Sequence, residues 1–219
     1  MYTVSIKELV TFHCKNRPLC LGCSRQLKRL DSFTRCSGCS RISEREAHCQ
    51  DCLAWRQRYP QLKLKHQAVY AYNGFAREMV KQFKFSGDCE LAAAFSEEIK
   101  ELTRCRRRSS LVIPIPISRS SIETRGFNQT ELLLESARIE YQRVLENAFQ
   151  REKQSKKTRF ERLESPQPFI VRDRMEGEIK GKNLIIVDDI YTTGRTVYHA
   201  AQLLSQYNPA SISSVSLFR

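Results

Sequence analysis

The sequence has no long apolar run. Nowhere do apolar residues approach the roughly 18 in succession that a membrane-spanning helix needs. The opening residues, MYTVSIKELVTF, also lack the basic segment and the apolar segment of a signal peptide. We therefore expect a cytoplasmic protein without a membrane-spanning segment. In that compartment disulfides are rare, and clustered cysteines more often bind metal or carry redox chemistry.

Two common nucleotide-binding motifs are missing as well. The chain contains neither a GxxxxGK(S/T) phosphate loop nor the GxGxxG of a dinucleotide-binding fold. Hydrophobic residues make up 41% of the chain, which is enough for a packed core and excludes wholesale disorder or a collagen-like fibre. A length of 219 residues fits one large α/β domain, or a medium domain with a small appendage.

Acidic residues are outnumbered. The chain has 24 Asp and Glu against 37 Lys and Arg, a net charge of +13. A charge of this sign favours association with nucleic-acid phosphates, although it could serve solubility alone. Basic residues recur at Arg104, Arg106, Arg107 and Arg108 and across 151–162, with Phe127 and Phe160 as candidate stacking surfaces.

Cysteine is scarce over most of the chain. Only Cys89 and Cys105 follow residue 52, whereas the other seven of the nine cysteines precede residue 53. This distribution predicts a cysteine-rich module over residues 1–60 and a larger domain over residues 61–219. Because so short a module has little apolar core, metal binding would supply most of its folding free energy.

Three Cys-x-x-Cys pairs occur in the module: CLGC (20–23), CSGC (36–39) and CQDC (49–52). Two such turns supply the four sulfurs of a tetrahedral zinc site. The spacing predicts a structural zinc ribbon with the ligands Cys36, Cys39, Cys49 and Cys52. A redox dithiol at one pair is the alternative, and a set of buried thiols does not explain the repeated spacing.

Cys20 and Cys23 form a second, weaker metal-binding candidate. Cys14 and His13 could complete a second site, or the pair 20/23 could combine with the pair 36/39 across twelve residues. The spacing leaves both arrangements open.

The larger domain alternates strand-like and helix-like segments. Strands are expected at 66–72 and 111–117, the latter breaking into a loop at its prolines. Helices are expected at 75–85, at 91–102 and, capped by Asn128, through 130–141. Residues 144–149 are ambiguous, and residues 150–168 suggest a mobile loop with a short helix.

The last third is clearer. A buried strand (183–190), a polar turn (192–196), a helix (197–207) and an alternating strand (211–218) form a βαβ unit, which indicates an α/β fold with a mostly parallel sheet. Ligands of such sheets bind beyond the carboxyl ends of the strands.

Two acids lie at such a strand end. Asp188 and Asp189 follow the apolar run NLIIV, and burying both is costly unless they serve a ligand. They could accept hydrogen bonds from sugar hydroxyls or hold a hydrated Mg²⁺. The next turn presents backbone N–H groups and hydroxyls at a helix N-terminus, which suits phosphate, through Thr192, Thr193, Gly194, Arg195 and Thr196.

Two acids that can bind ribose hydroxyls are followed by backbone N–H groups that can bind the 5′-phosphate. This order of groups indicates a ribose-5-phosphate site. The alternative, in which the acids cap a turn and Thr193 caps a helix, explains each residue separately but not their order. IIVDDIYTTGRT resembles the signature of type I phosphoribosyltransferases. The resemblance implies a sheet with helices on both faces, Asp188 and Asp189 as catalytic acids on the ribose of phosphoribosyl pyrophosphate (PRPP), and Mg²⁺ bound with PRPP.

The chain resembles the ComF/ComFC family of competence proteins over nearly its full length. The resemblance rests on the cysteine ribbon, on YAYNGFAREMVKQFKFSGD and on IPIPISRSSIETRGFNQTELL. It implies that Ser118 and Arg119 face the pyrophosphate, that Lys84 and Arg125 line the same cleft, and that the basic stretch within 150–168 closes over it. For a Lys/Arg run in a polar loop, a solvated surface is the plainer alternative.

The family resemblance also implies a role. It suggests action in natural transformation, handling incoming single-stranded DNA in the cytoplasm with a ComFA-type helicase-like ATPase, with association at the inner face of the membrane only through partners. An active Mg-dependent phosphoribosyltransferase with an unidentified acceptor is the alternative. Family members commonly begin with a further Cys-x-x-Cys pair, which this sequence lacks, so the partners of Cys20 and Cys23 are in doubt.

Overall fold

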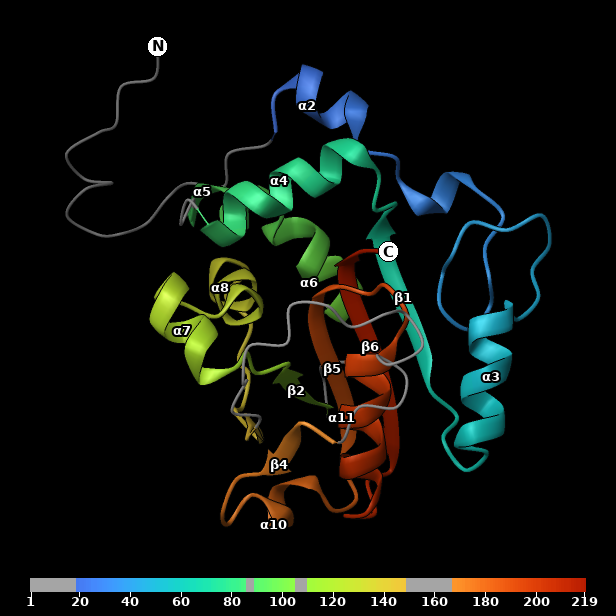
Figure 1. The fold of residues 1–219 in the computed structure, drawn as a ribbon, viewed down its shortest axis with the longest axis vertical. Coiled ribbons are helices and arrows are strands. Elements are labelled where there is room, and N and C mark those ends of the chain that lie inside the picture. The colour runs from blue at the N-terminus through green and yellow to red at the C-terminus, as the bar shows by residue number, and fades with distance from the viewer. Residues whose placement is uncertain (1–18, 86–88, 105–109, 149–166) are drawn as a thin grey trace.

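A four-stranded parallel sheet forms the centre of the molecule in the computed structural model, which describes residues 19–85, 89–104, 110–148 and 167–219 (Figure 1). The strands are β1 (Lys65–Tyr70), β6 (Ser211–Phe218), β5 (Asn183–Ile190) and β2 (Ser110–Pro114), in that order across the sheet. The all-parallel pairing confirms the α/β prediction.

Strand β5 is buried on both faces because its apolar residues are continuous. Leu184 and Ile186 join one core, whereas Ile185 and Val187 join the other. Successive side chains of a strand point to opposite faces, so a run without polar interruptions requires cover on both.

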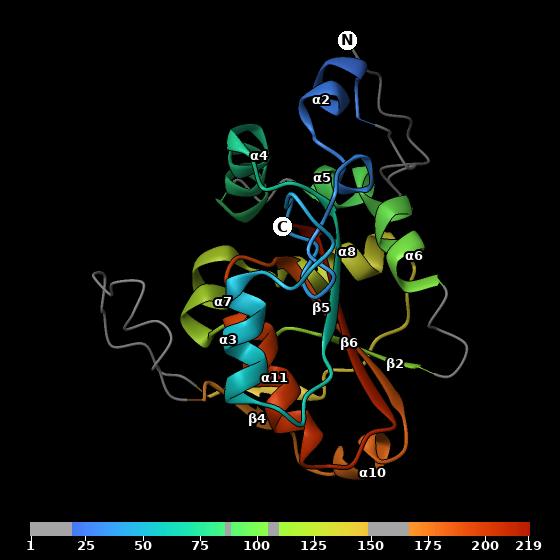
Figure 2. The ribbon, with the colours of Figure 1, turned by 90° about the vertical axis from the view of Figure 1, so that its right-hand side faces the viewer.

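Helices supply that cover. One face packs against α4 (Gly74–Phe85), α5 (Cys89–Ala94), α6 (Ser96–Arg104) and α8 (Gln129–Ser136). The other packs against α11 (Arg195–Ser205), α10 (Glu176–Ile179) and Trp55 of α3 (Gln50–Arg58). Figure 2 shows α3 beside α11, so helices lie on both faces of the sheet, as expected.

Smaller elements complete the described chain. These are α2 (Leu21–Gln26), a 3-10 helix (Leu30–Ser32), α7 (Arg119–Arg125), and an antiparallel pair, β3 (Leu145–Asn147) with β4 (Phe169–Val171). The ambiguous stretch at 144–149 therefore contains the short strand β3. Within the described ranges, no helix is both long and apolar enough to cross a bilayer.

Two expected helices are wrong in extent. The helix expected at 91–102 is broken at Phe95, whose ring packs 5.9 Å from Tyr70 and 5.7 Å from Phe218. The helix expected through 141 ends at Ser136, because Arg138 adopts a left-handed backbone with φ of 52°. That turn brings Ile139 into the core. In both cases burial of one apolar side chain overrides helix periodicity.

Candidate functional site

Asp188 and Asp189 lie at the carboxyl end of β5, which is an interior strand of the sheet. Each carboxylate accepts a hydrogen bond from the next backbone N–H, at 2.9 Å from Asp189 N and 3.0 Å from Ile190 N. Lys84 of α4 places its Nζ 2.6 Å from Asp189 Oδ2. The structure thus joins Lys84 to the acidic pair, although Lys84 and Asp189 are 105 residues apart in sequence.

Burial shapes the chemistry of Asp188. Only 8% of this residue is exposed. Burial, and then the neighbouring charge of Asp189, raise the pKa of Asp188 well above its ordinary value of 3.8, and the Lys84 ammonium opposes the rise. A buried carboxyl of this kind suits hydrogen bonding to hydroxyls, because hydroxyls can both donate and accept.

The turn after β5 runs from Tyr191 to Gly194 and leads into α11. Gly194 has a φ of +83°, and a Cβ at this position would collide with the Tyr191 hydroxyl, so only glycine fits. Gly194 is also the N-cap of α11 and, as a glycine, has no side chain with which to cap the helix. Arg195 and Thr196, predicted as turn residues, are the first residues of the helix. The N-terminus of an eleven-residue helix therefore follows the acidic pair after one short turn.

The remaining predicted ligand residues lie on or beside α7. Ser118 caps α7 by accepting a hydrogen bond from Ser121 N. The Arg119 side chain is 93% exposed and lies 3.5 Å from Glu123, its ion-pair partner. Arg125 donates to Gln129 Oε1 at 3.3 Å and lies 5.5 Å above the centre of the Phe85 ring. These contacts join Arg119 and Arg125 to their own surroundings rather than to the acidic pair.

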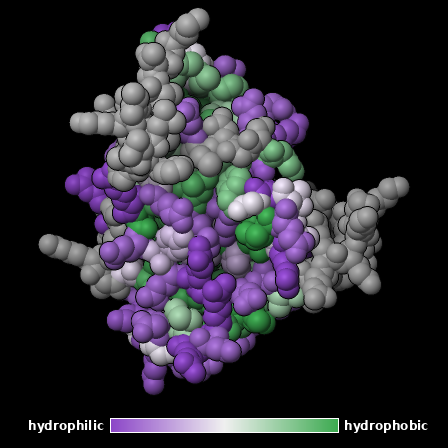
Figure 3. All heavy atoms as spheres, turned by 90° about the vertical axis from the view of Figure 1, so that its left-hand side faces the viewer, coloured by the Kyte–Doolittle hydropathy of each residue, from purple (hydrophilic) through white to green (hydrophobic). Residues whose placement is uncertain are grey.

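The surface on the side of α7 is mixed in character. Figure 3 shows hydrophilic residues over much of the coloured surface, with small apolar patches between them. The large hydrophobic residues exposed in the described parts of the chain include Phe85 (70%) and Ile122 (41%). Phe85 therefore offers an accessible aromatic ring next to Lys84 in sequence. The basic segments 106–108 and 151–162 lie outside the described residues, and so does the candidate stacking residue Phe160.

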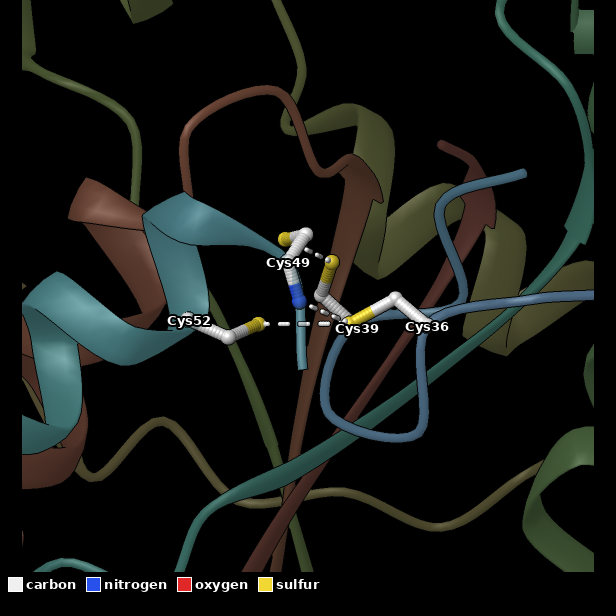
Figure 4. Close-up of side chains that lie close together, drawn as sticks. All are labelled: Cys36, Cys39, Cys49 and Cys52. Atoms are coloured by element: carbon white, nitrogen blue, oxygen red, sulfur yellow. Dashed lines mark hydrogen bonds between the residues drawn. The ribbon is translucent and has the colours of Figure 1, made fainter. Parts of the chain in front are cut away.

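Four cysteines form a compact cluster next to Tyr191 of the turn after β5. The sulfurs of Cys36, Cys39, Cys49 and Cys52 all lie within 4.8 Å of one another (Figure 4). Two of these separations, Cys36 to Cys52 and Cys39 to Cys49, are 3.7 Å. Tetrahedral zinc with Zn–S distances of about 2.3 Å requires sulfurs about 3.8 Å apart. The donor set and its spacing fit a structural zinc ion, as the sequence predicted.

Without a metal the surroundings favour thiolate at Cys39 but not at every cysteine, because the contact with Cys39 raises the pKa of Cys52 and burial raises that of Cys49. The N–H groups of Gly38 and Cys49 donate to Cys36 Sγ at 3.4 and 3.2 Å. The contact with the Cys52 thiol lowers the pKa of Cys39 to about 4 against the opposing effect of burial, and the charge of Arg219 adds to the lowering. Thiolate is the form that binds zinc. A Cβ at position 38 would lie 2.9 Å from Cys52 Sγ. Gly38 therefore allows Cys52 to approach the turn Cys36–Cys39, which we call the first cysteine knuckle.

Cys20 and Cys23 lie outside this cluster, on α2. Cys20 is the N-cap of α2, and its sulfur accepts from Cys23 N at 3.4 Å. The arrangement that combines 20/23 with 36/39 is wrong, because 49/52 occupies that place. His13 and Cys14, the other suggested partners, lie outside the described residues.

Three residues that the sequence did not single out connect the cysteine cluster to the turn: Trp55, Tyr191 and Arg219. Tyr191 packs against Cys36, Cys39 and Cys52, and Trp55 hydrogen-bonds to the carbonyl of Thr193. The boundary near residue 60 stays a prediction, but the two sides of it share cores. The sequence carries no signal for these contacts, since residues 55 and 193 are 138 positions apart.

A family model and solved structures both match part of this chain. The family model of the phosphoribosyl transferase domain matches residues 121–219, which include the acidic pair and the turn. A crystal structure of a hypoxanthine phosphoribosyltransferase from Staphylococcus aureus aligns with 58% of this chain and 62% of its own, at 17% identity and a TM-score of 0.37.

Curated relatives cover nearly the whole chain. Competence protein ComFC of Bacillus subtilis is 36% identical, over 92% of this chain and 84% of its own. Competence protein ComFC of Streptococcus pneumoniae is 32% identical, over 92% and 87%. DNA utilization protein YhgH of Escherichia coli O6:H1 is 29% identical, over 92% and 90%. With its parallel sheet, four-cysteine cluster and strand-end acids, the chain belongs to the ComFC family of competence proteins.

Proposed function

We propose that this protein acts in DNA uptake and that it binds PRPP, or a related ribose phosphate, at the carboxyl end of β5. One observation carries the ribose-phosphate part: two acids at the end of an interior strand are followed, after one short turn, by the N-terminus of an eleven-residue helix. The names of the relatives, competence and DNA utilization proteins, support the role in DNA uptake.

In this proposal each part of the site has a distinct task. Asp188 and Asp189 accept hydrogen bonds from the ribose hydroxyls, and Lys84 balances the charge of Asp189. The turn from Thr192 to Thr196 receives the 5′-phosphate at the positive end of α11. Ser118 and Arg119, at the start of α7, remain the proposed pyrophosphate contacts.

Mg²⁺ and zinc have separate proposed sites. Mg²⁺ enters with the diphosphate of PRPP and neutralises its charge, and carboxylate with phosphate oxygens is the ligand set it prefers. Asp188 and Asp189 supply the carboxylate oxygens at that end of the sheet. Zinc is bound by Cys36, Cys39, Cys49 and Cys52, where it stabilises the fold.

The decisive experiment for the ribose-phosphate site is calorimetric titration of the zinc-loaded protein with PRPP and Mg²⁺. Asp189→Asn should weaken binding about 100-fold or more, because the substitution removes an acceptor for a sugar hydroxyl together with the charge that holds Lys84. Asp173→Asn, the same exchange at an exposed acid outside the site, should leave the affinity unchanged. Equal affinities of the two variants would contradict the assignment.

A second candidate function is phosphoribosyl transfer to an acceptor. It is favoured by the match of the phosphoribosyl transferase family model to residues 121–219. Incubation with labelled PRPP and Mg²⁺, with and without single-stranded DNA and candidate bases, separates the two functions. Release of pyrophosphate supports transfer, whereas tight binding without release supports a binding module.

We also propose that the protein binds single-stranded DNA, in the cytoplasm, together with a ComFA-type helicase or ATPase, and reaches the membrane only through such partners. The net charge of +13 supports contact with phosphates. The exposed ring of Phe85, with the Arg125 guanidinium beside it, supports stacking of a base.

Fluorescence anisotropy of a labelled oligonucleotide tests the DNA proposal. Binding should weaken steeply as salt rises, since each neutralised phosphate releases counterions. Phe85→Ala should weaken binding about 5- to 100-fold, the usual effect of losing one stacked base. Leu53→Ala is the matched control, because Leu53 is another exposed apolar side chain, on α3. Affinity independent of salt would argue against a phosphate-led interface.

A further inference from the structure

The cysteine cluster and the proposed phosphate turn contact each other through shared side chains. Tyr191, the first residue of the turn, is buried in one cluster with Cys36, Cys39 and Cys52, and its ring stacks on the ring of His66. The His66 and Tyr191 ring centres are 4.0 Å apart. His66 in turn donates its backbone N–H to Gly38 O at 2.9 Å, inside the first cysteine knuckle. A shift of that knuckle therefore displaces the side chain that underlies the turn.

Arg219, the residue after β6, bridges the cluster and the turn with one guanidinium. On the cluster side it donates to Cys39 O at 3.0 Å and to Cys39 Sγ at 3.1 Å. On the turn side it donates to Thr192 O at 2.8 Å and lies within 3.4 Å of Tyr191 O. The planar guanidinium fixes the direction of every bond it makes, so Cys39 and the turn carbonyls cannot move independently.

Trp55 provides a second link, through α3. Cys49 is the N-cap of this helix and Cys52 is within its first turn, so two of the four cluster sulfurs set its position. Trp55 lies one turn further on and donates from Nε1 to Thr193 O at 2.7 Å. Its ring also stacks on Tyr198 of α11, with centres 4.6 Å apart. The helix that carries two cluster ligands therefore holds both the turn and α11.

These contacts are made to the carbonyls of the turn. Tyr191, Thr192 and Thr193 all accept from Arg219 or Trp55. A phosphate would be bound through the opposite groups of the same peptides, their N–H donors, and through the first turn of α11. Holding three successive carbonyls orients the peptide planes, and so orients the donors that would meet the phosphate.

We infer that Arg219 and Trp55 are positioning residues that couple zinc occupancy of the four-cysteine cluster to ligand binding at the phosphate turn. The inference rests on the proposed function for its ligand and on zinc as the metal. With zinc bound, the cluster fixes Cys39 and α3, and through them the turn. Without zinc, the competent geometry of the turn is populated less, and the apparent affinity for a ribose phosphate falls by the same fraction.

Coupling of this kind is reciprocal. If zinc strengthens ligand binding by a given factor, the ligand strengthens zinc binding by that factor. A purely structural zinc ion, one that holds its own module and nothing else, would give no such effect in the folded protein.

Hydrogen exchange of zinc-loaded variants tests the positioning role without a ligand. Arg219→Met and Trp55→Phe retain the apolar parts of the side chains and remove the donors. Each should speed amide exchange in the peptides covering 192–197 about 10-fold and leave β5 amides unchanged. Arg172→Met, at an exposed arginine beside β4, should change neither. Metal analysis verifies one zinc per chain in every sample. Unchanged exchange at 192–197 in both variants would overturn the inference.

Zinc competition tests the coupling itself. A chromogenic chelator should need about 10-fold higher concentration to strip zinc when PRPP and Mg²⁺ are saturating. In Arg219→Met the protection should fall to about 2-fold. If PRPP binds the wild type yet gives no protection, the coupling is refuted. If PRPP does not bind the wild type at all, the proposed function fails, and the exchange experiment alone decides the role of Arg219 and Trp55.

Discussion

Residues 19–62 and the parallel sheet meet at the turn after β5, but they bury different kinds of side chain. The sheet buries continuous aliphatic strands under helices on both faces. Two buried apolar residues of the cysteine module are shared with the larger domain: Leu27 joins one of its cores, and Trp55 joins the other. The centre of the module itself is the four-cysteine cluster.

The difference teaches where each part obtains its stability. Apolar burial contributes roughly 25 cal/mol per Å² and grows with domain size, so the sheet can stabilise itself. A short segment centred on four thiols cannot do so without a metal. With zinc as the proposed metal, the module would depend both on that ion and on the domain it packs against.

The largest expected effect follows from breaking the cluster. Replacing Cys36 and Cys39 with serine should abolish zinc binding and lower the unfolding temperature by about 10 °C or more, because structural zinc supplies several kcal/mol of folding free energy. Replacing Cys20 and Cys23 with serine is the matched control, since this pair lies outside the cluster. Metal analysis and thermal unfolding measure both. Equal zinc content in the two double variants would show that the cluster is not the metal site.

A smaller change in the unfolding temperature, of opposite sign, is expected at Asp188, at the carboxyl end of β5. The pKa of Asp188 is raised above 3.8 by burial, so its contribution to stability is complete below pH 3.8 and is lost as pH rises through the raised value. At neutral pH the carboxylate therefore costs folding free energy. Asp188→Asn should raise the unfolding temperature at pH 7.5 by a few degrees, for a gain of about 1 kcal/mol, while abolishing PRPP binding.

The pH dependence distinguishes this cause from improved packing. The gain in Asp188→Asn should shrink as the pH is lowered toward 4, where the wild-type carboxyl is protonated and neutral. Thermal unfolding at several pH values measures it, and Asp173→Asn controls for loss of a negative charge at the surface. If the asparagine variant is less stable than wild type at pH 7.5, the attraction between Lys84 and the Asp188 carboxylate exceeds the free-energy cost of burying that carboxylate, and the prediction is wrong.

Local patterns predicted much of the fold. The continuous run at 183–190 and the alternating run at 211–218 became β5 and β6 at the expected bounds, because burial on a sheet is encoded residue by residue. The cap at Asn128 was likewise predicted, since its side chain satisfies a neighbouring backbone N–H. Helix ends were predicted less well. The helix end at Ser136 depends on how Ile139 packs into the core, which is decided only when the core is assembled.

The sequence by itself determined the cysteine pairs, the strand-end acids and the α/β class. Each of these depends on groups close together in the chain, so spacing and periodicity are sufficient to recognise them. Only the tertiary structure decided which cysteine pairs combine, that Lys84 reaches Asp189, and that Arg219 joins Cys39 to Thr192. Such contacts join residues brought together by sheet order and helix packing. No local pattern specifies them, because their free energy is gained only after the chain has folded.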